Sequence, residues 1–203
     1  MRKFILLATA ISIIAGCSKN DENVKWDNAM NDIAGKYKVT AIESSSIGQS
    51  MDLDGDGEAH SDLLLEFKGL PNGIGNITYM PTNVTKATTS DRTGFINFFF
   101  PIQGLYEVNG EVVPERTLGC QAYVRVTYTV SDDYRIITED IKEDPGSQDI
   151  SRPDLNTLSD IHVSFSAPDE MQFEISVLLY DFKKGKAEKE HLVYTFTRYE
   201  YEE

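Results

Sequence analysis

Three aspartates at alternate positions have the residue types and the spacing of a metal site. Asp52, Asp54 and Asp56 lie in one acidic segment and are followed directly by Gly57. In calcium loops, carboxylates at alternate positions converge on one cation, and a glycine permits the sharp turn between them. The pattern therefore predicts calcium as a candidate cofactor, held by these three carboxylates.

The second half of this loop departs from a calcium site. Its twelfth position, where a bidentate Glu is expected, is Leu63, and Asp62 stands one place too early. A hard cation takes roughly six to eight oxygen ligands, so the ligand set is incomplete. The alternative interpretation is an acidic turn between two strands, in which Asp and Gly serve the backbone geometry. The flanking segments are predicted as strands, which also departs from a helix-flanked calcium loop. Both interpretations predict an exposed loop.

No other set of side chains has the spacing of a catalytic site. His60, His162 and His191 are far apart in the sequence, and no nucleophile or metal-ligand motif accompanies them. The positions of His162 and His191 within alternating segments predict side chains that face solvent. Carboxylates are so numerous that any two could be paired on paper, so no pair identifies a hydrolase. The sequence therefore predicts a protein with no catalytic residue, which is not an enzyme.

The first sixteen residues have the composition of an export signal. Arg2 and Lys3 precede an uncharged, mainly apolar run over residues 4–16. The run is shorter than the roughly 20 residues that a helix needs to cross a bilayer. Residues 14–17, of sequence IAGC, resemble the lipobox of bacterial lipoproteins. The resemblance implies cleavage before Cys17 and lipidation of its thiol.

The segment after Cys17 predicts where the protein is displayed. Residues 18–23 are polar and partly acidic, and they resemble the export signal that follows the lipidated cysteine in surface lipoproteins of Bacteroidetes. The resemblance implies an outer-membrane lipoprotein on the cell surface rather than on the periplasmic face. A plain solvated linker is the alternative. With Cys17 lipidated, Cys120 has no disulfide partner and is predicted to be a buried thiol.

The net charge excludes one class of partner. The 203 residues include 19 Lys and Arg against 33 Asp and Glu, a net charge of −14. Removing Arg2 and Lys3 with the signal takes away two positive charges and leaves −16. Nucleic acid is excluded because an acidic surface repels phosphates. The expected partners are the lipid anchor in the outer membrane and either a small apolar ligand or a partner protein.

Residues 24–203 are predicted to form one all-β domain. Trp26, Met30 and Ile33 share a helix face and precede Gly35, which predicts a short helix over 24–34. Beyond Gly35, polar and apolar residues alternate as in half-buried antiparallel strands. The predicted strands cover residues 62–69, 74–80, 104–108, 111–113, 122–130, 161–165, 171–182 and 191–201.

Turns separate the predicted strands and favour a barrel. Asn109-Gly110 is a strong hairpin signal, residues 183–189 link two strands, and residues 143–156 form the longest predicted loop. Roughly eight to ten strands joined by hairpins predict an antiparallel barrel or a sandwich. Closure into a barrel is favoured because it removes exposed edges.

The first and the last predicted strands resemble those of lipocalins. Gly35-Lys36-Tyr37 opens the first strand, and Arg198 lies near the end of the last. In lipocalins a Gly-x-Trp motif opens the first strand, and an Arg of the last strand packs across that ring and closes the barrel base. Here Tyr37 replaces the Trp. Together with the lipobox, the tether and the acidic loop, the chain resembles lipocalin-like lipoproteins of Bacteroidetes.

The resemblance implies a lipocalin-like barrel that binds a small apolar ligand or a partner protein, closed by Tyr37 and Arg198. The alternative is a filled barrel, a non-catalytic accessory subunit that docks onto a larger outer-membrane assembly. No ligand-binding residue is identified. Phe98, Phe99 and Phe100 are consecutive rings, so at least one is predicted to point away from the core. The alternative is that both faces of this strand are buried, with the N-terminal helix covering the rings that point away from the core.

Overall fold

The computed structural model describes residues 27–46, 49–70, 81–86, 93–114, 121–130, 136–142 and 158–200, and only the backbone of residues 121, 130 and 136–142. Residues 27–33 are helical. The other elements are β1 (Gly35–Ser44), α2 (Leu63–Gly69), β2 (Thr82–Thr85), β3 (Thr93–Pro101), β4 (Leu105–Val108), β5 (Glu111–Pro114), β6 (Gln121–Val130), β7 (Ile136–Lys142), β8 (Ser159–Ala167), β9 (Glu170–Asp181) and β10 (Lys186–Arg198).

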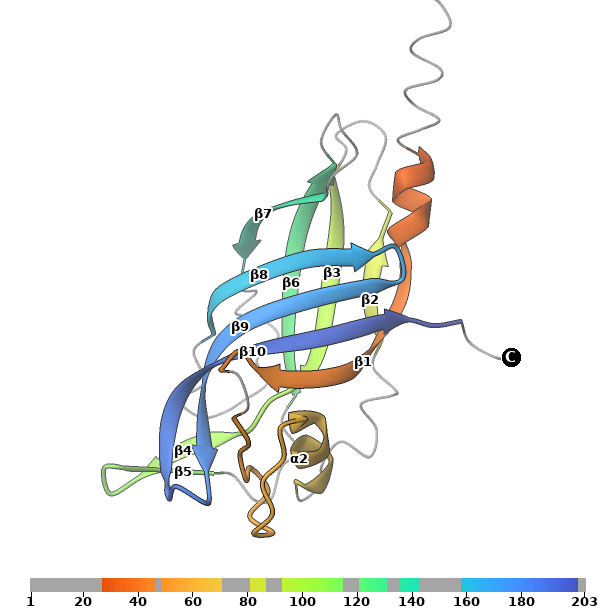
Figure 1. The fold of residues 1–203 in the computed structure, drawn as a ribbon. Coiled ribbons are helices and arrows are strands. Elements are labelled where there is room, and N and C mark those ends of the chain that lie inside the picture. The colour runs from red at the N-terminus through yellow and green to blue at the C-terminus, as the bar shows by residue number, and fades with distance from the viewer. Residues whose placement is uncertain are drawn as a thin grey trace, which may run out of the picture.

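Most strands that are neighbours in the large sheet are consecutive in the chain, and the exceptions are the pairs β3-β6 and β1-β10. The order is β7-β6-β3-β2-β1-β10-β9-β8, each pairing is antiparallel, and the first strand pairs with the last. The hairpin β4-β5 is inserted between β3 and β6. The sheet curls until Cα atoms of its edge strands β7 and β8 approach within 8 Å, as Figure 1 shows. The described part of the chain is thus a curled, half-closed antiparallel sheet, and the all-β prediction is confirmed.

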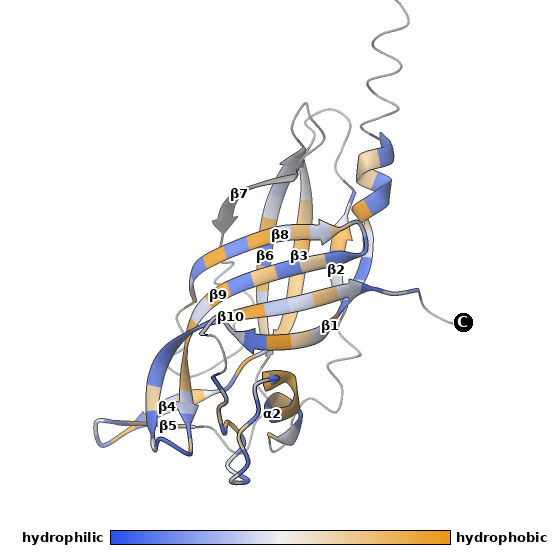
Figure 2. Ribbon diagram, viewed as in Figure 1, coloured by the Kyte–Doolittle hydropathy of each residue, from blue (hydrophilic) through white to orange (hydrophobic). Residues whose placement is uncertain are grey.

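Alternation along the strands places the apolar side chains inside this curl. In β9 the odd-numbered residues from Met171 to Leu179 are fully buried, as predicted. Side chains at alternate positions of a strand point to opposite faces, so their neighbours face outward. Figure 2 shows the resulting bands of apolar and polar residues along β8 and β9.

The predicted N-terminal helix is present over residues 27–33. Met30 and Ile33, two of the three residues expected on its inner face, are buried against the core. The third, Trp26, lies outside the described residues, as do residues 24 and 25. In Figure 1 the helix leads directly into β1 at one end of the curled sheet.

Residues 62–69 form a helix, α2, where the sequence analysis predicts a strand. Asp62 is the N-cap, and its carboxylate accepts a hydrogen bond from the Leu64 amide at 3.1 Å. Leu63, Leu64 and Phe67 are buried, and their spacing is that of one helix face. The strand prediction was wrong because a short apolar run does not distinguish the two periods, whereas the N-cap does.

The turn predictions are confirmed where the structure describes them. Asn109 and Gly110 connect β4 to β5, with φ of 53° and 85°. The turn after β9 is shorter than the predicted linker over 183–189, since β10 already begins at Lys186. Residues 74–80 and the loop over 143–156 lie outside the described residues.

Candidate functional site

The interior of the curl contains a cluster of aromatic rings from both halves of the sheet. Phe98 of β3 stacks on Phe173 of β9 at 4.2 Å between ring centroids. Phe100 lies 5.1 Å from Phe173 and 5.1 Å from Tyr194. Phe98 also contacts Phe196 of β10 edge to face at 5.4 Å. We call these five residues the lumen cluster.

The lumen cluster occupies the interior of the curled sheet between β3, β9 and β10. Four of the five side chains have no exposed surface, and Phe100 retains 1%. A lumen wide enough for a ligand would leave water-accessible surface on the side chains that line it. The rings meet across the sheet at contact distance, so they stabilise the fold by burial and by ring contacts.

The run Phe98 to Phe100 divides between the two faces, as predicted. Phe99 lies on the outer face, half-buried, 4.9 Å from the ring of Tyr123 on β6. On the same face, Phe95 is 42% exposed and the Arg125 guanidinium lies 5.7 Å from its ring centroid. We call Phe95, Phe99, Tyr123 and Arg125 the aromatic patch.

One asparagine orders the polar groups of the aromatic patch. The side-chain oxygen of Asn97 accepts hydrogen bonds from the Tyr123 hydroxyl at 2.8 Å and from Arg125 Nε at 2.9 Å. These contacts hold the phenol and the guanidinium on neighbouring positions of the outer face. The patch therefore presents apolar rings together with one oriented guanidinium.

Tyr37 and Arg198, the residues expected to close the barrel, face each other in the β1-β10 register. The Tyr37 hydroxyl lies 2.7 Å from the Ile33 carbonyl and 3.0 Å from the Pro168 carbonyl. It thereby connects the N-terminal helix and the β8-β9 turn to β1. Burial raises the pKa of Tyr37 to about 12, and the nearby positive charge of Arg198 opposes that rise.

Arg198 caps the N-terminal helix. Its guanidinium donates to the Asp32 carbonyl at 2.9 Å, and a positive charge is favourable at the C-terminal end of a helix. It also crosses Gly35 closely: a Cβ on that residue would lie 2.9 Å from Arg198 Nε. The sequence Gly35-x-Tyr37 thus leaves room for the arginine and supplies the hydroxyl.

The acidic loop over residues 52–58 is organised by its own carboxylates. Asp52 is 3% exposed and accepts hydrogen bonds from the amides of Gly55 at 2.7 Å and Gly57 at 3.1 Å. Asp54 and Asp56 each accept from the amide two residues further on, at 3.0 and 2.7 Å. These are the local turns expected of Asp. The carboxylates therefore serve the backbone geometry, whether or not a cation binds.

A fourth carboxylate, Glu66 of α2, joins this loop. It is 1% exposed and accepts from the Leu53 amide at 2.8 Å and the His60 amide at 3.0 Å. Oxygens of Asp52, Asp54 and Glu66 lie within 4.8 Å of one another. The structure thus brings together two of the three predicted ligands with Glu66, and Asp56 is not in this group.

Sequence analysis missed Glu66 because it lies beyond the twelve-residue calcium pattern, in a segment predicted as strand. The available signal was the helical spacing of Glu66 with the apolar residues Leu63 and Phe67. The three carboxylates offer oxygen ligands of the kind that a hard cation prefers. They supply fewer than the roughly six to eight ligands of calcium, so carbonyls or water would have to complete the shell.

His60 offsets part of the negative charge of this group. Its imidazole Nδ1 contacts the Glu66 carboxylate. The hydrogen bond with Glu66 raises the pKa of His60, and the charges of Glu66, Asp56 and Glu58 act in the same direction against the smaller effect of desolvation. Below neutral pH a protonated His60 therefore takes the role of a counter-ion.

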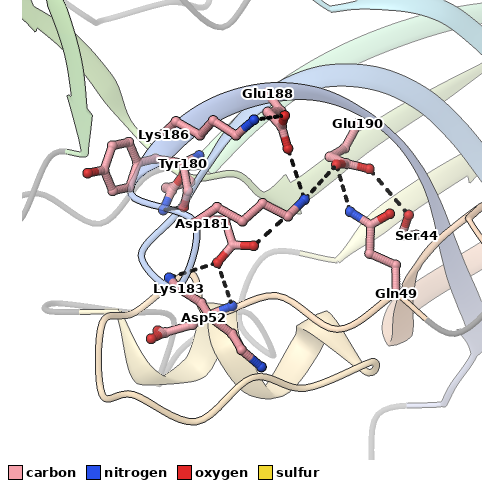
Figure 3. Close-up of polar contacts among 11 residues, drawn as sticks. Ser44, Gln49, Asp52, Tyr180, Asp181, Lys183, Lys186, Glu188 and Glu190 are labelled. Atoms are coloured by element: carbon pink, nitrogen blue, oxygen red, sulfur yellow. Dashed lines mark hydrogen bonds and ion pairs between the residues drawn. The ribbon is translucent and has the colours of Figure 1, made fainter.

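Two buried side chains attach the acidic loop to the end of β9. Gln103 donates to the carbonyls of Leu53 at 2.9 Å and Tyr180 at 3.0 Å, and its oxygen accepts from the Tyr180 amide at 2.6 Å. Asp181 accepts from the amides of Asp52 at 3.3 Å and Lys183 at 2.9 Å. Figure 3 shows Asp181, at the end of β9, next to Asp52 of the acidic loop.

Charged side chains continue this contact over the β9-β10 hairpin. Glu190 accepts a hydrogen bond from Gln49 at 2.7 Å (Figure 3). Glu188 accepts from Lys184 at 2.9 Å. Hydrogen bonds from Lys186 and Lys184 lower the pKa of Glu188 to about 2. The exposed position of this network limits its contribution to stability.

Several predicted features lie outside the described residues. They are the signal over 1–16, the lipidated Cys17, the tether over 18–23, and Cys120. Among the residues that the structure describes, no helix combines the length and the apolar composition needed to cross a membrane.

The chain was compared with protein-family models, curated proteins and solved structures, and none of them matches it. The assignment of a function therefore rests on the residues and on the geometry given above.

Proposed function

We propose that the protein is a lipid-anchored, non-catalytic accessory lipoprotein of the outer membrane, which contacts a partner protein through the outside of a filled, lipocalin-like barrel. The observation that carries this proposal is the lumen cluster. Because its rings occupy the space inside the sheet, binding is assigned to the outer surface instead of to the lumen.

Four features support a lipocalin-like barrel. Eight strands follow one another around the sheet, the first pairs with the last, and a short helix precedes the first strand. Tyr37 and Arg198 are opposite each other at the end where that helix meets the sheet. The resemblance implies a pair at these two positions, with Tyr in place of Trp, and Arg198 here donates to the Asp32 carbonyl of the helix.

The proposed lipid anchor and the proposed location on the cell surface rest on the sequence alone. Residues 14–17 supply the lipobox, and residues 18–23 supply the tether that favours the cell surface. A diacylglycerol and an N-acyl chain together provide more than one buried chain, which is what stable anchoring requires. Lipidation of Cys17 would thus hold the barrel at the membrane without any spanning segment.

The aromatic patch supports a protein partner. Phe95 keeps 42% of its surface exposed while neighbouring Tyr123 and Arg125 are held by Asn97. Aromatic residues and Arg are enriched where proteins bind one another, because they combine large area with directed hydrogen bonds. A rigid sheet face presents these groups with little loss of conformational entropy on binding.

Site-specific photo-crosslinking in intact cells tests this proposal. A photoreactive residue in place of Phe95 is expected to give one discrete adduct with an outer-membrane protein, and Arg125→Ala is expected to lower its yield several-fold. The same photoreactive residue at Gln172, on the outer face of β9, is the control. Absence of an adduct from position 95, or the same adduct from position 172, would contradict the proposal.

A further inference from the structure

The outer face of β1, β2, β3 and β6, which lie side by side in the sheet (Figure 1), carries positive charge on an acidic protein. Residues 35–42 of β1 and the whole of β2, β3 and β6 contain no Asp or Glu, although the chain has a net charge of −14. The cations of these segments are Lys36, Lys38 and Arg125, and all of them are exposed. By contrast, β8, β9 and β10 each contain acidic residues. The half of the sheet that contains the aromatic patch therefore favours anions.

Strand pairing sets one polar row across this half of the sheet. Lys36 of β1 pairs with Asn83 of β2, which pairs with Asn97 of β3. Asn97 in turn pairs with Arg125 of β6. Residues paired directly across strands share one face, and the exposure of Lys36 and Arg125 shows that it is the outer face. We call these four residues the polar row, and Arg125 belongs both to it and to the aromatic patch.

Arg125 keeps donors for a ligand while two contacts hold it in place. Its Nε donates to the Asn97 side-chain oxygen at 2.9 Å, and its guanidinium lies 5.7 Å from the centroid of the Phe95 ring. Neither contact uses the hydrogen-bond donors on the two Nη atoms. A carboxylate can therefore bind end-on, across both Nη atoms, through charge-assisted hydrogen bonds.

The two asparagines of the polar row offer one donor and one acceptor. The Asn97 oxygen accepts from Arg125, which can only donate, so the amide nitrogen of Asn97 remains a donor. Asn83 Nδ2 donates to the Pro81 carbonyl at 3.1 Å, so the Asn83 oxygen remains an acceptor. A donor and an acceptor on neighbouring strands complement the C=O and N–H groups of a peptide backbone.

The length of the polar row matches two carboxylates on an extended segment. Neighbouring strands are about 4.8 Å apart, so the backbones at Lys36 and Arg125, separated by three strand spacings, lie about 14 Å apart. In an extended chain, residues i and i+4 point to the same side and lie about 13 Å apart. The flexible side chain of Lys36 accommodates the small difference.

We propose that the polar row and the aromatic patch together bind an extended acidic segment of the partner protein, which carries two carboxylates four residues apart. This inference rests on the proposed function, because it names the chemistry of the partner that the aromatic patch contacts. Arg125 binds one carboxylate and Lys36 binds the other, and the two asparagines contact the peptide groups between them. The exposed ring of Phe95 covers an apolar side chain of the same segment.

The charge pattern favours a protein segment over a polyanion such as an acidic polysaccharide. A polyanion is held by a dense set of Lys and Arg, whereas the cations of these strands are few and separated by amides and rings. The net charge of −14 also repels a charged polymer that extends past the polar row. Isolated carboxylates avoid that repulsion, because they interact within a Debye length, about 8 Å in physiological salt.

Charge-reversed variants in the photo-crosslinking experiment test this proposal. The measured quantity is the yield of the adduct from a photoreactive residue at position 95 in intact cells. Arg125→Glu and Lys36→Glu are each expected to lower the yield by about tenfold, since each turns a carboxylate contact into a repulsion. Arg125→Lys keeps the charge and is expected to retain most of the yield. Lys183→Glu, the same change of charge in the exposed β9-β10 turn, is the matched control and is expected to leave the yield unchanged.

Mass spectrometry of the adduct identifies the partner segment, which is expected to contain two Asp or Glu residues four positions apart. A full yield from Arg125→Glu or from Lys36→Glu would overturn the proposal of an acidic segment, and the proposed function would stand. An adduct with a protein segment that lacks acidic residues, or an equal loss of yield in Lys183→Glu, would have the same meaning. An adduct with polysaccharide in place of protein, or no adduct from the natural chain, would overturn both proposals.

Discussion

At the scale of single residues, burial separates side chains that otherwise look alike. Phe95 and Phe98 both belong to β3, yet Phe95 is 42% exposed and Phe98 has no exposed surface. Their sequence positions differ by an odd number, so a strand places them on opposite faces. The first therefore lies exposed on the outer face, and the second stabilises the core.

Phe98→Ala is expected to lower the free energy of unfolding by about 3–5 kcal/mol, since it removes a ring that stacks on Phe173 and leaves a cavity. Phe95→Ala is the control and is expected to cost less than about 1 kcal/mol. Urea denaturation of both variants measures the difference. Equal losses would show that Phe98 does not contribute to a packed lumen.

Ionisation of Tyr37 is expected to destabilise the protein at high pH. Its pKa in the folded state, about 12, lies above the value of about 10 in an unfolded chain. A group whose pKa is raised by folding contributes stability below pH 10, and this contribution is lost as the pH rises toward 12. The free energy of unfolding is expected to fall over that range.

Tyr37→Phe separates this effect from the titration of other groups. The variant loses the hydroxyl and its contacts with the Ile33 and Pro168 carbonyls, so it is less stable at neutral pH. Its stability is expected to fall less between pH 10 and 12, as measured by urea denaturation at each pH. An identical fall in both proteins would contradict the assignment to Tyr37.

The residue types of the candidate sites were readable from the sequence, but their partners were not. Asp52 and Asp54 were predicted together because the calcium pattern is local in sequence. Glu66 joins them through the fold of α2, and Asn97 meets Arg125 through strand pairing. Contacts across strands depend on register, and a bulge such as that at Asp160 leaves no signal in a simple alternating pattern.

At the scale of elements, strands with strict alternation were predictable and the acidic segment was not. β6, β8 and β9 follow from period two, because each has one face in the core. α2 is only seven residues long and depends on its Asp62 cap and on packing against the loop. Tertiary contacts decide the conformation of so short an element.

A calcium site here would combine carboxylates of the acidic loop with Glu66 of α2. If the carboxylates of Asp52, Asp54 and Glu66 bind Ca²⁺, excess Ca²⁺ raises the thermal unfolding midpoint and a chelator reverses the shift. Asp54→Asn removes a charge from the group and is expected to reduce the shift. Asp56→Asn, outside the group, is the control. An unchanged midpoint with Ca²⁺ and with chelator would remove calcium from the account.

At the scale of the whole molecule, the chain combines a predicted lipid anchor with a filled sheet. Cys17→Ala is expected to release the protein from the membrane fraction, because lipidation of that thiol is the proposed attachment. Cys120→Ala is the control and is expected to stay membrane-bound. Immunoblots of fractionated cells measure both. Membrane retention of Cys17→Ala would contradict the anchor.

We propose that the lumen is filled and that the protein carries no small apolar ligand in it. Fluorescence titration of the natural protein with an apolar naphthalene-sulfonate probe tests it most directly. The account predicts no saturable binding to the folded chain, and a new binding site in Phe98→Ala if its cavity stays open. Saturable binding of one probe per natural chain would contradict the account.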